Sequence, residues 1–89
     1  MAYIGETIEL MCSDDYKDRM LAEYQQLVIR KDALENLLTK WEKGELNFTP
    51  KCPKEMLVKQ FELMEQYAEI LRQRGLIELG EDMSLTLGE

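Results

Sequence analysis

Residues 53–74 read PKEMLVKQFELMEQYAEILRQR, and this stretch decides the fold. Pro53 suits the first turn of a helix, where a backbone N–H is not needed, and no glycine follows until Gly75. Apolar or small residues recur at alternating spacings of four and three, the 3.5-residue period of helices that pack as in a coiled coil. They are Leu57, Phe61, Met64, Ala68, Leu71 and Gly75. The stretch therefore predicts a helix over residues 53–74, with Gly75 as the residue just past its end.

The segment before it predicts a matching helix over residues 13–43. Ser13 is a favourable N-cap, and the acids that follow it lie at the positive end of the helix dipole. Gly44 ends the segment. Its apolar seam has the same period and consists of Met20, Tyr24, Leu27, Leu34, Leu38 and Trp41. Lys31 fills the missing position, where we expect it either to extend its stem outward or to fix the register.

Two long helices joined by a short loop, residues 44–52, predict an all-α fold, an antiparallel two-helix hairpin with coiled-coil-like packing. Residues 1–12 are predicted to be an N-terminal arm, either a short strand or an ordered segment. Residues 75–89 form an acidic tail that alternates weakly in hydrophobicity, which favours a small β-hairpin over the alternative of a partly disordered tail. The whole chain, 1–89, is expected to be one domain.

The second helix carries more apolar surface than one partner helix covers. Met56, Leu63 and Ile70 form a stripe beside the seam. Together the seam and the stripe cover an arc of about 180° on this helix, whereas an ordinary surface helix has an apolar arc of ~100°. We therefore expect a dimer or higher homo-oligomer with these three residues at or beside the interface; the arms or a target protein are the alternative covers.

Gln60, Tyr67 and Arg74 run between the seam and this stripe at intervals of seven residues. An amide, a phenol and a guanidinium on one face are suited to binding a base, a phosphate or a carboxylate. The alternative is that they form hydrogen bonds across a subunit interface. They are the candidate ligand- or partner-binding residues.

The chain has 89 residues, a net charge of −7 and no histidine. This charge argues against free nucleic acid and anionic membranes as partners, and no apolar run approaches the ~20 residues of a membrane span. The charge is concentrated at the ends, because residues 1–18 and 76–89 each carry −4 while 19–75 carry +1. The predicted acidic tip comprises Asp14, Asp15, Asp18, Glu78, Glu81 and Asp82. Such a tip either engages a basic surface on a partner or keeps a small protein soluble.

The two cysteines, Cys12 and Cys52, form no C-x-x-C pair. Without histidine, we expect no metal site, no cofactor and no Cys–His or Ser–His catalysis. The sequence predicts a non-enzymatic protein with reduced thiols.

The segments IGETIELM-S-DDYK-R (residues 4–19), AEY with L-x-x-R-x-x-x-L (22–34), and CP-x-E-x-L-x-x-Q with M-x-x-Y-x-x-I-L-x-x-R (52–74) resemble small helical-hairpin proteins of tailed phages and prophages, including crAss-like phages. The resemblance covers most of the chain but not the tail. It implies a role in the cytoplasm of a bacterial host. Small phage proteins of this size often counter host defence, as anti-CRISPR inhibitors or as sponges for immune signalling nucleotides. That step is an analogy.

Three functions compete. The first is a stoichiometric inhibitor that binds and blocks a host immune protein, favoured by the acidic tip and the stripe. The second is a sponge that sequesters a cyclic or ADP-ribose-type signalling nucleotide at a subunit interface, favoured by the Gln60/Tyr67/Arg74 row. The third is an oligomeric structural or assembly protein of the phage.

Overall fold

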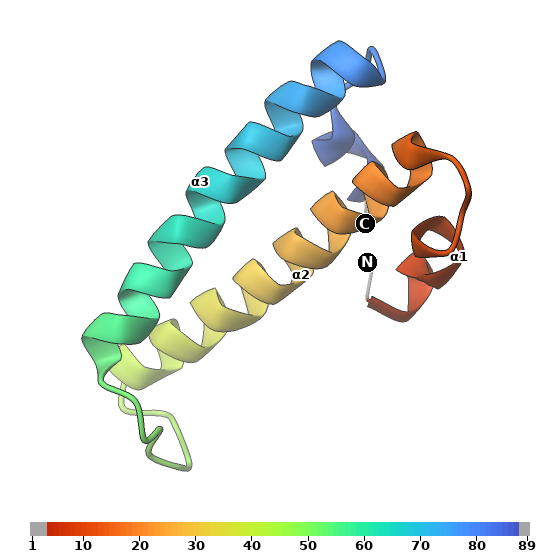
Figure 1. Cartoon of the computed structure of the whole chain (residues 1–89). Helices are drawn as coiled ribbons and strands as arrows, with labels where there is room; N and C mark the ends of the chain where they lie inside the picture. Colours follow the sequence, from red (N-terminus) through yellow and green to blue (C-terminus); the bar gives the residue numbers. More distant parts are fainter. Residues whose placement is uncertain (1–3, 88–89) are drawn as a thin grey trace.

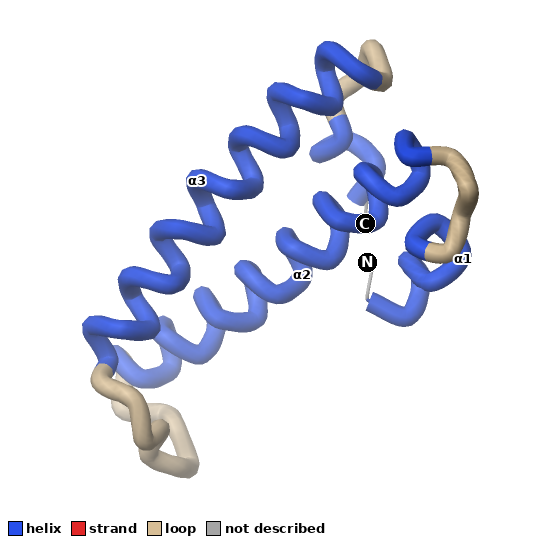
Figure 2. Tube along the Cα trace, viewed as in Figure 1, coloured by secondary structure: helices blue, strands red, loops and turns tan. Residues whose placement is uncertain are grey.

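The computed structural model describes residues 4–87, and two long antiparallel helices dominate it. Helices α2 (Tyr16–Glu42) and α3 (Lys54–Glu78) form the predicted hairpin, which Figure 1 shows from the side. Residues 1–3 of the predicted arm and 88–89 of the predicted tail lie outside the described residues. Between residues 4 and 87 the chain contains helices and loops but no strand (Figure 2).

The predicted start of the first long helix at Ser13 is wrong by three residues. Helix α2 begins at Tyr16, and its N-cap is Asp15, whose side chain accepts a hydrogen bond from the Lys17 backbone N–H at 2.9 Å. Ser13 instead organises the turn before the helix. Its hydroxyl accepts from the Asp15 N–H at 3.0 Å and donates to the Asp18 carboxylate at 2.8 Å. At the other end, Gly44 follows α2 with a φ of +71°, as its place after the helix predicted.

The predicted end of the second helix at Gly75 is also wrong, because α3 continues to Glu78. Gly75 lies inside the helix, where a Cβ atom would come within 2.8 Å of the Met83 Cε. The glycine therefore permits a close approach between helix and tail. Gly80, with a φ of +74°, is the glycine that ends the helix.

The expected β-hairpin in the tail is wrong. Residues 77 and 78 belong to α3, which removes its first strand, and the rest folds back as the 3₁₀-helix η2 (Met83–Leu87). Met83 is fully buried against α3, where Gly75 leaves room for it. Burial of this side chain favours the return of the tail, and a half-exposed strand pair would forgo it.

The N-terminal arm is helical and not a strand. It consists of the 3₁₀-helix η1 (Ile4–Thr7) and the short helix α1 (Ile8–Met11), which pack against α2. Thr7 is fully buried at this contact. Its hydroxyl donates to the Ile4 carbonyl and accepts from the Gln26 amide, both at 2.7 Å.

The core lies in the half of the hairpin nearest the chain ends, where arm and tail add their contacts. Its buried members are Met20, Tyr24, Leu27, Ala68, Leu71 and Met83. Toward the loop the seam is half-buried. There the Lys31 side chain is 19% exposed, and its ammonium nitrogen lies 5.6 Å from the centre of the Phe61 ring and 3.5 Å from Asp32. Lys31 thus packs its stem in the seam and holds its charge over an aromatic face.

Candidate functional site

A surface hollow of about 290 Å³ lies where the start of α2 meets the end of α3. Both helices and the arm contribute to it, because an antiparallel hairpin brings these ends together (Figure 1). Its lining residues are Met11, Tyr16, Arg19, Met20, Glu23 and Arg74. Two guanidinium groups, a phenol ring and two thioethers therefore share one open concave surface.

The two arginines of the hollow keep most of their donors available. Arg19 donates from Nη1 to the Ser13 carbonyl at 2.7 Å. Among residues 4–87, neither Arg19 nor Arg74 forms an ion pair with a carboxylate. Both side chains are exposed. Guanidinium groups in this state suit phosphate or carboxylate oxygens, which they bind in a forked geometry.

Two phenols donate hydrogen bonds to carboxylates at or beside this hollow. Tyr16 donates its hydroxyl hydrogen to Glu78 at 2.8 Å, and that bond, with the nearby negative charge, raises the pKa of Tyr16. Tyr67 donates to the Glu23 carboxylate in the same way. Each of these carboxylates accepts a hydrogen bond from a phenol, and neither forms an ion pair with Arg19 or Arg74.

The structure separates the predicted row of Gln60, Tyr67 and Arg74. Arg74 lines the hollow, and Tyr67 reaches it through Glu23. Gln60 is exposed, and fourteen residues of helix, about 21 Å, separate it from Arg74. A single chain therefore does not bring all three to one ligand.

The predicted acidic tip is largely engaged in the chain's own structure. Asp15 caps α2 and Asp18 accepts from Ser13. Glu78 accepts from Tyr16, and Asp82 accepts from Arg72. The remaining two, Asp14 and Glu81, are exposed.

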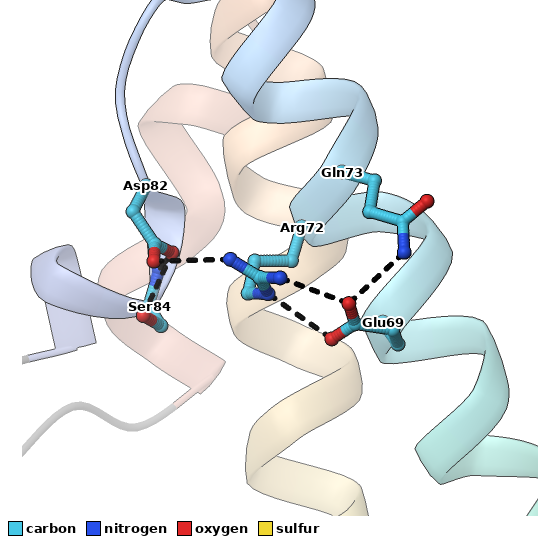
Figure 3. A network of polar contacts seen from close by, with 5 residues as sticks. All are labelled: Glu69, Arg72, Gln73, Asp82 and Ser84. Carbon is cyan, nitrogen blue, oxygen red and sulfur yellow. Dashed lines mark hydrogen bonds and ion pairs between the residues drawn. The ribbon is translucent and has the colours of Figure 1, made fainter.

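The sequence reasoning missed a polar network that attaches the tail to α3 (Figure 3). Arg72 donates to Glu69 from Nε at 3.0 Å and Nη2 at 2.9 Å, and to Asp82 from Nη1 at 3.2 Å. Gln73 also donates to Glu69 at 3.0 Å, and Ser84 donates to Asp82 from its backbone N–H and hydroxyl.

These contacts lower the pKa of two carboxyl groups. The hydrogen bonds from Arg72 and Gln73 lower the pKa of Glu69 to about 2, and those from Ser84 lower the pKa of Asp82. The i,i+3 spacing of Glu69 and Arg72 and the Asp-x-Ser turn at residue 82 were the signals in the sequence. This network therefore occupies the guanidinium group of Arg72.

The stripe of Met56, Leu63 and Ile70 is uncovered in the single chain, with exposed fractions of 60%, 51% and 55%. The predicted oligomer interface thus remains a prediction. Cys12 and Cys52 are free and exposed. Over the described range, no group of three or more metal-binding side chains comes together, and no helix there has the length and apolar character needed to cross a membrane.

Comparison with curated proteins and with solved structures finds no match to this chain. The model of one protein family, Sequestin, matches residues 14–75. The matched part begins just before α2 and ends at Gly75 in α3, so it contains α2, most of α3 and both arginines of the hollow. It spans well over half of the chain, and the chain therefore belongs to the Sequestin family.

Proposed function

We propose that this protein sequesters a small phosphate-bearing ligand of the nucleotide class in the hollow between α2 and α3. One observation carries the proposal: Arg19 and Arg74 share the hollow and form no ion pair with residues of the described chain. In a protein with a net charge of −7, two such cations are not needed for solubility. The family name, Sequestin, suggests a sequestering protein and supports binding without turnover.

The hollow offers what a nucleotide needs. The guanidinium groups of Arg19 and Arg74 are suited to the phosphates. The half-exposed ring of Tyr16 and the thioether of Met11 provide apolar surface for a base. Glu23 is a hydrogen-bond acceptor for a ribose hydroxyl or an exocyclic amine.

The biological setting is part of the proposal. The resemblance to small phage proteins favours a phage-encoded, non-enzymatic protein in the cytoplasm of a bacterial host. Its ligand would then be a cyclic or ADP-ribose-type immune signal, whose capture neutralises the defence. Binding of this kind is stoichiometric, so the protein must accumulate to at least the concentration of the signal.

Titration calorimetry with ADP-ribose and with cyclic dinucleotides tests the proposal. The parent protein should bind at least one of them, and Arg74→Ala or Arg19→Ala should weaken binding about ten- to a hundredfold, as expected for one charge-assisted hydrogen-bonding group. Arg30→Ala is the matched control, because Arg30 is an exposed arginine of α2 outside the hollow. Equal losses in Arg74→Ala and Arg30→Ala, or no binding by the parent, would refute the proposal.

A second candidate is the inhibition of a host immune protein through the acidic ends. The observation that favours it is the charge distribution, with Asp14 and Glu81 exposed at the same end of the hairpin. The double variant Asp14→Asn/Glu81→Gln removes charge without breaking a capping bond. Under this hypothesis, the parent protein binds a host immune protein. The double variant should bind that protein more weakly and with less salt dependence, whereas Arg74→Ala should bind it as the parent does.

A further inference from the structure

Helix α3 carries a second seam of 3.5-residue period, and this one faces solvent. The stripe and the polar row interleave at spacings of four and three: Met56, Gln60, Leu63, Tyr67, Ile70, Arg74 and Ile77. The first seam is covered by α2. Ile77 extends the apolar stripe by one further turn and is 83% exposed. Two seams on one helix are what a helix needs to pack against two partners at once.

The apolar stripe is symmetric about its own centre. Met56 and Ile77 lie equally far from the point between residues 66 and 67, and so do Leu63 and Ile70. A second copy of α3 laid antiparallel about a two-fold axis at this point therefore pairs Met56 with the second copy's Ile77, and Leu63 with the second copy's Ile70. Such an interface is self-complementary, as a two-fold dimer requires.

The seam is flanked on one edge by Lys59, Gln66 and Gln73. About the axis between residues 66 and 67, Lys59 lies level with the second copy's Arg74, and Gln73 lies level with its Gln60. The antiparallel direction therefore rests on the symmetry of the apolar stripe.

The exposed area is of the size that a second copy would cover. The exposed apolar surface of this seam is on the order of 500 Å², which is at the upper end for a monomer. It consists of the Tyr67 ring and four side chains that are at least half exposed, Met56, Leu63, Ile70 and Ile77. A stable interface buries about 800 Å² on each partner. The polar members of the seam and its edges supply the difference.

We propose that two copies pair through antiparallel α3 helices, and that Gln60 of each copy completes the other copy's hollow beside Arg74. About the axis between residues 66 and 67, Gln60 of one copy lies opposite Gln73 of the other, one residue from Arg74. The pairing therefore brings Gln60 and Arg74 close together across the dimer, although they are far apart in one chain. The amide can then donate to and accept from a nucleobase edge. The ligand role of Gln60 rests on the proposed function, whereas the pairing does not.

Sedimentation velocity tests the pairing without ligand. The parent should sediment as a dimer at micromolar concentration, and Leu63→Glu/Ile70→Glu should sediment as a monomer with unchanged helical circular dichroism. Leu85→Glu is the matched control, since Leu85 is 79% exposed but lies in η2, and it should remain dimeric. A monomeric parent, or a double variant that stays dimeric, would overturn the pairing.

Cross-linking with a short bismaleimide tests the direction, in a background where Cys12 and Cys52 are replaced by serine. A mixture of Lys59→Cys and Gln73→Cys proteins should give cross-linked dimers containing one of each. Either variant alone should give few, because the antiparallel arrangement separates identical positions by about 20 Å along the helix. Efficient cross-linking of Lys59→Cys alone would show a parallel pair and contradict the proposal.

Calorimetry separates the two parts. Gln60→Ala should weaken nucleotide binding several-fold in the dimer, whereas Gln66→Ala, at the axis and away from the hollow, should not. A dimer that binds no nucleotide would refute the proposed function and leave the pairing standing. A dimer whose nucleotide affinity is unchanged by Gln60→Ala would refute the shared site alone.

Discussion

Replacement of Gly75 by alanine tests the contact between α3 and the tail, and its effect should reverse with the residue at position 83. Alanine favours a helix interior over glycine by about 1 kcal/mol. In this structure, however, the new Cβ would lie 2.8 Å from Met83 Cε and 3.0 Å from Met83 Cγ. The terminal methyl can move, but a shift of Cγ moves the whole buried side chain, and overpacking of this kind costs about 1–3 kcal/mol.

We therefore expect Gly75→Ala to lower the free energy of unfolding by up to about 2 kcal/mol. Met83→Ala alone should lower it by about 2–5 kcal/mol, because Met83 is fully buried. In the Met83→Ala background the clash is gone, so Gly75→Ala should stabilise by about 1 kcal/mol. The double-mutant cycle thus predicts a coupling of about 1–3 kcal/mol.

Urea unfolding followed by circular dichroism at 222 nm measures all four proteins, with Leu85→Ala as a control at an exposed position of η2. The control should unfold within about 0.5 kcal/mol of the parent. If Gly75→Ala stabilises the parent as much as it stabilises Met83→Ala, the two side chains do not meet and the account of the tail is wrong.

Three further predictions follow from the polar contacts and the thiols. The lowered pKa of Glu69, about 2 against an ordinary 4.5, means that its contribution to stability is complete above about pH 4.5 and is lost as the pH falls toward 2. In urea titrations Glu69→Gln should therefore lose less stability than the parent across that window, and parallel curves would contradict this. Thr7→Val should cost about 1–3 kcal/mol by leaving the Gln26 amide and the Ile4 carbonyl without their partner; thermal melts indistinguishable from the parent would show that the arm is not held by Thr7. Cys12 and Cys52 flank opposite ends of α2, about 40 Å apart, so non-reducing mass spectrometry should find no intrachain disulfide, and finding one would exclude the hairpin.

The hairpin could be predicted because the hydrophobic period that defines each helix lies within the helix's own sequence. The 3.5-residue period in residues 53–74 and its match in residues 13–43 define two packed faces whatever the rest of the chain does. Gly75 misled the sequence reasoning since a glycine near a helix end usually ends the helix. Its real role depends on Met83, which lies eight residues further along the chain and outside α3.

The structures of the tail and the arm could not be predicted from the hydrophobic pattern, because they too depend on contacts between residues far apart in the sequence. Alternation in residues 77–79 favoured a strand, but α3 continues through residues 77 and 78 and adds one more turn of backbone hydrogen bonds. The arm is placed by the Thr7–Gln26 contact, between residues nineteen positions apart.

Of the two arginines that line the hollow, the sequence pattern named one. The seven-residue spacing identified Arg74, whereas Arg19 is on the other helix and no spacing connects the two. A signal existed, because Arg19 lies near the start of one helix and Arg74 near the end of the other, and an antiparallel hairpin brings those ends together. What the sequence could not supply was that Glu78 and Glu23 bond to Tyr16 and Tyr67 and form no ion pair with either arginine.

The central claim is that Arg19 and Arg74 hold the ligand, and NMR of the arginine side chains tests it most directly. Spectra of the Nε–Hε groups would be recorded while ADP-ribose or a cyclic dinucleotide is added to the full-length protein. We expect the resonances of Arg19 and Arg74 to shift together and saturably, while those of Arg30 and of Arg72, held by Glu69 and Asp82, stay in place. Saturable shifts at Arg30 or Arg72 with Arg19 and Arg74 unmoved would place the ligand elsewhere and contradict the account.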